Sequence, residues 1–112
     1  MIFPKYKKNW EIAHNGERYQ AIQRLHKKLD DRGIPNDFHE LLDGYQICVP
    51  KEHRKNGWEG DAVQNFGSYG AEEDLIEVYG FSLEDPDGYL TADEALEYFE
   101  KWWAKEKKEA QE

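Results

Sequence analysis

The sequence predicts a two-layer α+β domain, in which an N-terminal and a C-terminal helix cover an antiparallel sheet of about four strands. Helical spacing of apolar residues near both ends predicts the two helices. The short β-prone runs between them, joined by short connections, favour an antiparallel meander. With 112 residues, the chain is expected to form one domain over residues 1–112, with flexible ends at 1–10 and 106–112.

The first helix is predicted over residues 17–32. Its apolar side chains recur at i, i+3 and i+7, namely at Ile22, Leu25 and Leu29. Gly33 occupies the position where a glycine commonly ends a helix. Asn15 or Gly16 is the expected N-cap.

A β-hairpin is predicted next, with strands at residues 37–42 and 45–49. The intervening Asp43-Gly44 pair suits a two-residue turn, because both residues of that turn type require positive φ. A third strand is expected at residues 61–66.

Residues 74–79 are compatible with a strand or a helix. A fourth strand is favoured, because β-branched and aromatic residues dominate and glycines flank the run. The final helix is predicted from Thr91 or Ala92 to about Lys107, with a stripe formed by Leu96, Phe99 and Trp103.

Charge is distributed unevenly along the chain. Residues 1–70 hold 11 Lys+Arg and 10 Asp+Glu, whereas residues 71–112 hold 4 and 14, so the second part carries the excess behind the net charge of −9. Such a chain repels nucleic acid, and nucleic-acid binding is not expected. The single cysteine, the lack of a signal-peptide pattern and the lack of a long apolar run predict a cytoplasmic protein without a membrane span.

Residues 85–94 resemble part of a calcium-binding EF-hand loop. With Gly88 at loop position 6, Asp85, Asp87 and Glu94 fall at ligand positions 3, 5 and 12. Position 1 is Leu83, however, and its apolar side chain cannot bind a cation.

The same residues also predict the start of a helix. In a capping box, the Thr91 side chain and the Glu94 side chain each accept a hydrogen bond from the other residue's backbone N–H. The residues before Thr91 then form a turn. This interpretation is preferred, because Thr91 and Glu94 have a complete structural role without a metal.

Outside residues 85–94, the sequence contains only weak candidates for catalytic residues. Asp37 and His39 share one face of a strand and form a candidate acid–base pair, although a solvent-facing polar stripe is the more frequent explanation of such a pattern. Cys48 is expected to be a buried thiol. No phosphate loop, dinucleotide fingerprint or zinc spacing occurs, so no cofactor is predicted.

Three short motifs resemble a pattern in uncharacterised proteins of phages and prophages. They are Gly-Ser-Tyr-Gly at 67–70, Leu-Ile-Glu at 75–77 and Gly-Tyr-Leu-Thr-Ala-Asp-Glu-Ala at 88–95. The resemblance implies a shared fold more than a shared activity. A phage origin would suit an acidic inhibitor that mimics the charge of DNA.

The sequence therefore predicts a small acidic protein, without enzymatic activity, that binds another macromolecule and most simply a protein. The sequence leaves open whether the protein also forms homo-oligomers. The expected partner surface combines carboxylates with two tryptophans: Glu72, Glu73, Asp74, Glu77, Glu97, Glu100, Trp102 and Trp103. The alternative is a calcium-binding or small catalytic protein that uses residues 85–94.

Overall fold

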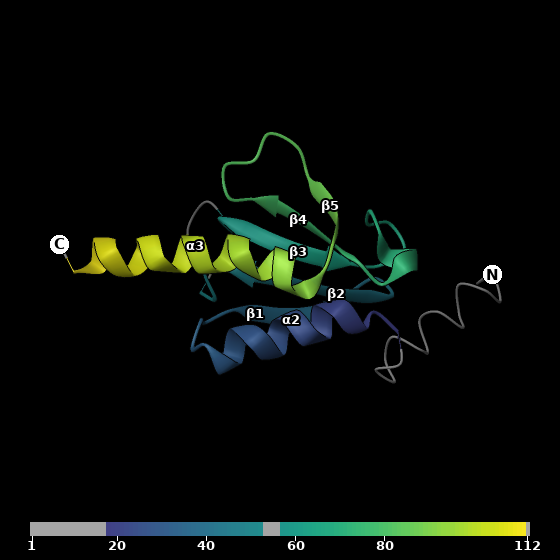
Figure 1. Ribbon diagram of the computed structural model, residues 1–112, viewed down its shortest axis with the longest axis horizontal. Coiled ribbons are helices and arrows are strands. Elements are labelled where there is room, and N and C mark those ends of the chain that lie inside the picture. Colours follow the sequence, from purple (N-terminus) through teal and green to yellow (C-terminus); the bar gives the residue numbers. More distant parts are fainter. Residues whose placement is uncertain (1–17, 53–56, 112) are drawn as a thin grey trace.

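A computed structural model describes residues 18–52 and 57–111 (Figure 1). Its elements in chain order are α2 (Gln20–Asp31), β1 (Asp37–Leu41), β2 (Gly44–Val49), β3 (Gly60–Gln64), the 3-10 helix η1 (Ala71–Glu73), β4 (Ile76–Gly80), β5 (Asp87–Leu90) and α3 (Ala92–Ala110). The five strands form one antiparallel sheet in the order β1-β2-β3-β4-β5. The α+β prediction is confirmed, with five strands instead of about four.

The two helices cover one face of this sheet. α2 packs on β2 and β3, and α3 packs on β4 and β5 beside α2. The core between the layers includes Ile22, Leu25, Ile47, Val78 and Phe99, which are all fully buried. No helix in the described part of the chain is long and apolar enough to cross a membrane.

The fifth strand lies in a segment for which the sequence predicted a turn. In β5, Asp87 is opposite Val78 and Leu90 is opposite Ile76, with an irregularity between these pairs. This strand was not predicted from the sequence, because it has only four residues and follows Pro86 directly.

The hairpin turn is displaced by one residue from its predicted position. Leu41 pairs with Gly44, so Leu42 and Asp43 form the turn, and Leu42 has φ of 59°. A Cβ on Gly44 would lie 1.9 Å from the Gln64 carbonyl oxygen. The glycine therefore permits close approach of β3 to β2, and the turn does not require its conformational freedom.

Helix α2 begins at Gln20, three residues later than predicted. Tyr19 is its N-cap, so neither predicted cap residue starts it; Asn15 and Gly16 lie outside the described residues. The predicted end is confirmed, because Gly33 follows the helix with φ of 69°.

Strand formation near residues 74–79 is also confirmed, with β4 placed at Ile76–Gly80. β3 begins one residue earlier than predicted and ends two residues earlier. α3 continues three residues beyond the expected Lys107.

The two helices run in the same direction, and α3 extends further. Lys28 pairs with Asp93 at 3.0 Å, and Arg32 pairs with Glu100 at 3.2 Å, so residue numbers rise together along both helices. α2 ends at Asp31, whereas α3 continues for ten residues after Glu100. Figure 1 shows this final part of α3, in yellow, projecting beyond α2 and the sheet.

Candidate functional site

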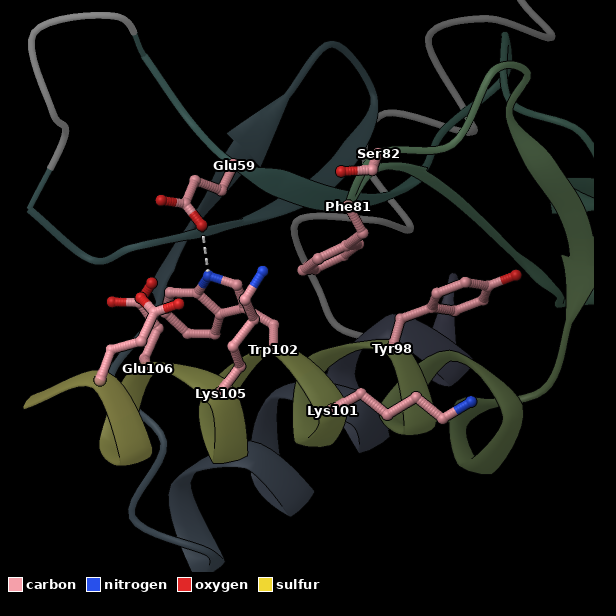
Figure 2. A pocket seen from close by; sticks show the side chains of 9 residues that line it. Glu59, Phe81, Ser82, Tyr98, Lys101, Trp102, Lys105 and Glu106 are labelled. Carbon is pink, nitrogen blue, oxygen red and sulfur yellow. Dashed lines mark hydrogen bonds between the residues drawn. The ribbon is translucent and has the colours of Figure 1, made fainter. Parts of the chain in front are cut away.

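The projecting part of α3 forms one wall of a cleft of about 590 Å³. The opposite wall comes from Glu59, immediately before β3, and from Phe81 and Ser82, immediately after β4. The α3 residues that line the cleft recur every three or four positions and so form one stripe: Tyr98, Lys101, Trp102, Lys105, Glu106 and Glu109. Figure 2 shows both walls and the opening between them.

A hydrogen bond across the cleft holds the Trp102 ring in place. The indole Nε1–H donates to the Glu59 carboxylate at 2.6 Å (Figure 2). Trp102 is only half-buried and packs against the edge of the core. This bond gives the ring a defined orientation while leaving part of its surface open to solvent.

Phe81 supplies the second aromatic surface. Its ring stacks on Tyr98 with a centroid distance of 6.1 Å and meets Phe99 edge-on at 5.1 Å. A Cβ on Gly60 would lie 2.3 Å from the Phe81 ring, so the ring rests directly on the backbone of β3. Packing on three sides therefore preorganises this wall.

Tyr98 connects α3 to β5. Its hydroxyl donates to Asp87 Oδ2 at 2.5 Å. This hydrogen bond, with a smaller contribution from burial, raises the pKa of Tyr98 above its ordinary value. The phenol is therefore neutral near pH 7 and anchors the start of the cleft.

The charged groups at the cleft differ in how they are paired. Glu59 accepts the Trp102 hydrogen bond, and Glu106 also has an interaction partner. Lys101 and Lys105 form no ion pair or hydrogen bond within the part of the chain that the structure describes. In Figure 2 the Lys105 side chain rises from α3 toward Phe81.

The predicted tryptophan patch is only partly present at this site. The sequence predicted that both tryptophans belong to the partner surface. Trp102 and Trp103 are both half-buried against the core, with ring centroids 5.9 Å apart. Only Trp102 lines the cleft.

The predicted partner-binding carboxylates lie on several elements, and half of them bond within the chain. Asp74 accepts from the Ala21 N–H, Glu77 accepts from the Tyr69 N–H at 3.3 Å, and Glu100 pairs with Arg32. The other three are exposed on η1 or α3: Glu72, Glu73 and Glu97. The six carboxylates therefore lie on or beside η1, on β4 and on α3.

At residues 85–94 the geometry matches the capping interpretation. The Glu94 N–H donates to Thr91 Oγ1 at 3.1 Å, and the Thr91 N–H donates to Glu94 Oε1 at 2.9 Å. Asp87 accepts from Tyr98, and Leu83 packs against the core, which explains its apolar side chain. Asp85 is exposed, and no cluster of three metal-binding side chains occurs among residues 18–52 and 57–111.

The Asp37–His39 pair belongs to a polar chain on the sheet face opposite the helices. His39 contacts Asp37 Oδ1 at 3.2 Å through Nδ1 and Gln46 Oε1 at 2.7 Å through Nε2. Gln46 in turn donates to Asp61 at 2.7 Å. Both ring nitrogens of His39 are therefore engaged, as in a structural network.

Cys48 lies beside this polar chain, opposite Asp37 and Asp61 in the neighbouring strands. Burial, reinforced by these two carboxylates, strongly raises the pKa of the thiol. A protonated and fully buried thiol is a poor nucleophile. The prediction that Cys48 is a buried thiol is confirmed.

Of the residues that line the cleft, the sequence analysis named only Trp102, and those that it missed include Glu59, Phe81 and Tyr98. The spacing of Tyr98, Trp102 and Glu106 at i, i+4 and i+8 could have indicated a second stripe on the helix. Glu59 and Phe81 reach the site only through the pairing of β3 with β4, for which no local pattern exists.

Comparison with known proteins identifies no relative. No family model matches the chain, and searches of curated proteins and of solved structures found no significant match. Functional inference therefore rests on the cleft geometry.

Proposed function

We propose that the protein has no catalytic activity of its own and binds a protein partner, a segment of which lies in the α3 cleft. The observation that carries this proposal is the half-buried Trp102 ring, oriented by Glu59 in a cleft beside the projecting part of α3. Tryptophan held in this way is typical of residues that dominate binding at protein interfaces.

The chemistry of the lining favours binding over catalysis. The described residues around the cleft include neither histidine nor cysteine, and the Glu59 carboxylate is already hydrogen-bonded. The preorganised groups are apolar surfaces of Phe81 and Trp102 with charged side chains around them. This is the usual arrangement of an interface, with an apolar centre and a polar rim.

A site-specific photo-crosslinker tests this proposal in the cells that normally contain the protein. At Ser82, on the cleft wall, it should capture a defined partner; at Tyr89, which is 59% exposed on β5 outside the cleft, it should not. Trp102→Ala should reduce capture at Ser82 by at least about tenfold, because it removes the anchor of the interface. Crosslinking yields are compared only between variants that are shown to be folded by circular dichroism and thermal unfolding.

Two results would contradict the proposal. One is equal capture of the same proteins at Ser82 and Tyr89, which would indicate contact without a defined site. The other is unchanged capture at Ser82 in a folded Trp102→Ala protein.

A further inference from the structure

We infer that the protein forms a symmetric dimer in which β1 pairs antiparallel with β1 of a second copy, in a register centred on Phe38. This interface lies at the β1 edge of the sheet, whereas the α3 cleft lies beside β3 and β4, so the dimer does not depend on the proposed function. Three features support it: the regular form of this edge, a groove beside it, and the side chains that self-pairing brings together.

The two edges of the sheet differ in how they resist pairing with another chain. Among the described residues, β1 and β5 each have one neighbouring strand. β5 has four residues, follows Pro86 and pairs irregularly with β4, and such features protect an edge. β1 has five residues in unbroken register with β2 and contains no proline. β1 is therefore the edge that is better suited to accept a further strand.

The hydrogen-bonding pattern of the hairpin directs the backbone of Phe38 toward the open side of β1. Leu41 and Gly44 flank a two-residue turn, and residues in this position exchange hydrogen bonds. Because bonded and non-bonded pairs alternate along an antiparallel ladder, Phe38 and Ile47 form a non-bonded pair. The Phe38 N–H and C=O therefore point away from β2. Two copies related by a twofold axis at Phe38 can exchange two hydrogen bonds between these groups.

A groove of about 630 Å³ lies beside the first half of β1. It is lined by His26 of α2 and by Asn36, Asp37, Phe38 and Lys51. The half-buried Phe38 ring stacks on His26 with a centroid distance of 4.2 Å. A twofold axis at Phe38 joins the grooves of the two copies and places both phenylalanine rings in the shared space. Their remaining exposed surface is then removed from water.

Side-chain pairing distinguishes this register from the other two that keep the helices of both copies on one face. An axis at Glu40 would place two carboxylates opposite each other, which is destabilising. An axis at His39 would place two imidazoles opposite each other and Glu40 opposite the apolar Phe38. The axis at Phe38 pairs the two aromatic rings and places Asp37 of each copy opposite His39 of the other, an acid opposite a base.

Sedimentation equilibrium of the intact chain over a range of concentrations tests the dimer. Phe38→Lys should raise the dissociation constant at least about tenfold, because it removes the paired rings and places two ammonium groups at the axis. The matched control is Tyr89→Lys, which makes the same kind of change at an exposed aromatic residue on the β5 edge and should leave the constant unchanged. The constants are compared only between variants that are folded by circular dichroism.

Disulfide crosslinking tests the register independently of Phe38. Asp37→Cys and His39→Cys are made in a Cys48→Ala background, because the native thiol lies opposite residue 37 on β2. In the inferred register, residue 37 of one copy and residue 39 of the other form a non-bonded pair with Cα atoms about 4.5 Å apart, which a disulfide can span. Mild oxidation should therefore link an equimolar mixture of the two variants, and link either variant alone much less.

Each other outcome contradicts the inference. A chain that remains monomeric at every concentration would overturn it, as would a dimer that Phe38→Lys leaves unchanged. Equal crosslinking in the mixture and in the single variants would exclude the register. Folded Trp102→Ala should dimerise as the wild type does; loss of the dimer in this variant would place the contact at the α3 cleft. Failure of any of these tests leaves the proposed function standing, because partner capture at Ser82 tests that function separately.

Discussion

The two α-helices in the described part of the chain begin in opposite ways. α3 is capped by its own first residues, because Thr91 and Glu94 exchange hydrogen bonds between side chain and backbone. α2 begins at Tyr19, which has left-handed backbone angles and provides no side-chain cap. The free N–H groups of its first turn are satisfied from elsewhere in the chain.

The remote cap of α2 consists of Gln64 and Asp74. Gln64 Oε1 accepts from the Ile22 N–H, and Asp74 Oδ1 accepts from the Ala21 N–H, both at 3.0 Å. Gln64 Nε2 also donates to Asp74 Oδ1 at 2.7 Å, which links the two caps. The caps come from the end of β3 and from the residue that follows η1, so they exist only when the sheet has formed.

This difference separates local from tertiary stabilisation. The capping box of α3 can form as soon as one helical turn forms. The first turn of α2 depends on residues 42 and 53 positions away. Mutations at the remote cap should therefore weaken the contact between α2 and the sheet, whereas mutations at the local cap should affect α3 alone.

The largest effect is expected for Gln64→Ala. Gln64 is fully buried, and its removal leaves the Ile22 N–H without a partner and creates a cavity. The free energy of unfolding, measured by urea titration, should fall by roughly 2–4 kcal/mol. Gln64→Met, which retains most of the volume, should recover the packing part only; full recovery by methionine would show that the hydrogen bonds contribute nothing.

Asp74→Asn is expected to have a smaller effect, because it retains the shape of the side chain but removes its charge. The free energy of unfolding at pH 7 should fall by about 1–2 kcal/mol. Burial alone would raise the pKa of Asp74, but hydrogen bonds from the Ala21 N–H and Gln64, with the Arg24 charge, outweigh it and lower the pKa below its ordinary value. The carboxylate therefore stabilises the fold above its unfolded-state pKa, and this stabilisation is lost as pH falls through the folded-state pKa.

The measurement compares unfolding free energies of the wild-type and Asp74→Asn proteins between neutral and acid pH. Their difference should decrease as pH falls below about 4, where Asp74 becomes protonated in the unfolded state and then in the folded state. Asp85→Asn is the matched control, because Asp85 is exposed. A wild-type advantage that persists undiminished in acid would show that the charge of Asp74 is not its source.

The same contrast explains what the sequence could predict. The capping box, the C-terminal glycine of α2 and the apolar stripes are patterns within a few residues, and all three were predicted correctly. The start of α2 was predicted wrongly, because its caps lie more than forty residues away. Asp74 was not predicted to cap α2, because nothing near it in the sequence indicates a helix N-terminus.

Prediction of the cleft was limited in the same way. Trp102 was a candidate because tryptophan beside carboxylates is typical of partner surfaces. The residue that orients it, Glu59, is 43 positions away and lies beside α3 only after β3 has joined the sheet. Sequence patterns therefore identified the anchor of the site, whereas its opposite wall depends on strand register.

The smallest effect is expected for Thr91→Ala, which should lower the free energy of unfolding by about 0.5–1 kcal/mol. The cap is exposed, so water can accept the hydrogen bond from the Glu94 N–H that Thr91 Oγ1 accepts in the wild type. Thr91→Ser should restore most of the stability, since it keeps the accepting hydroxyl. If the cap is local, combining Thr91→Ala with Gln64→Ala should give additive losses in the free energy of unfolding. A coupling clearly above about 0.5 kcal/mol would instead show that the two helix starts depend on each other through α2–α3 packing, and that the local cap of α3 also contributes to the tertiary structure.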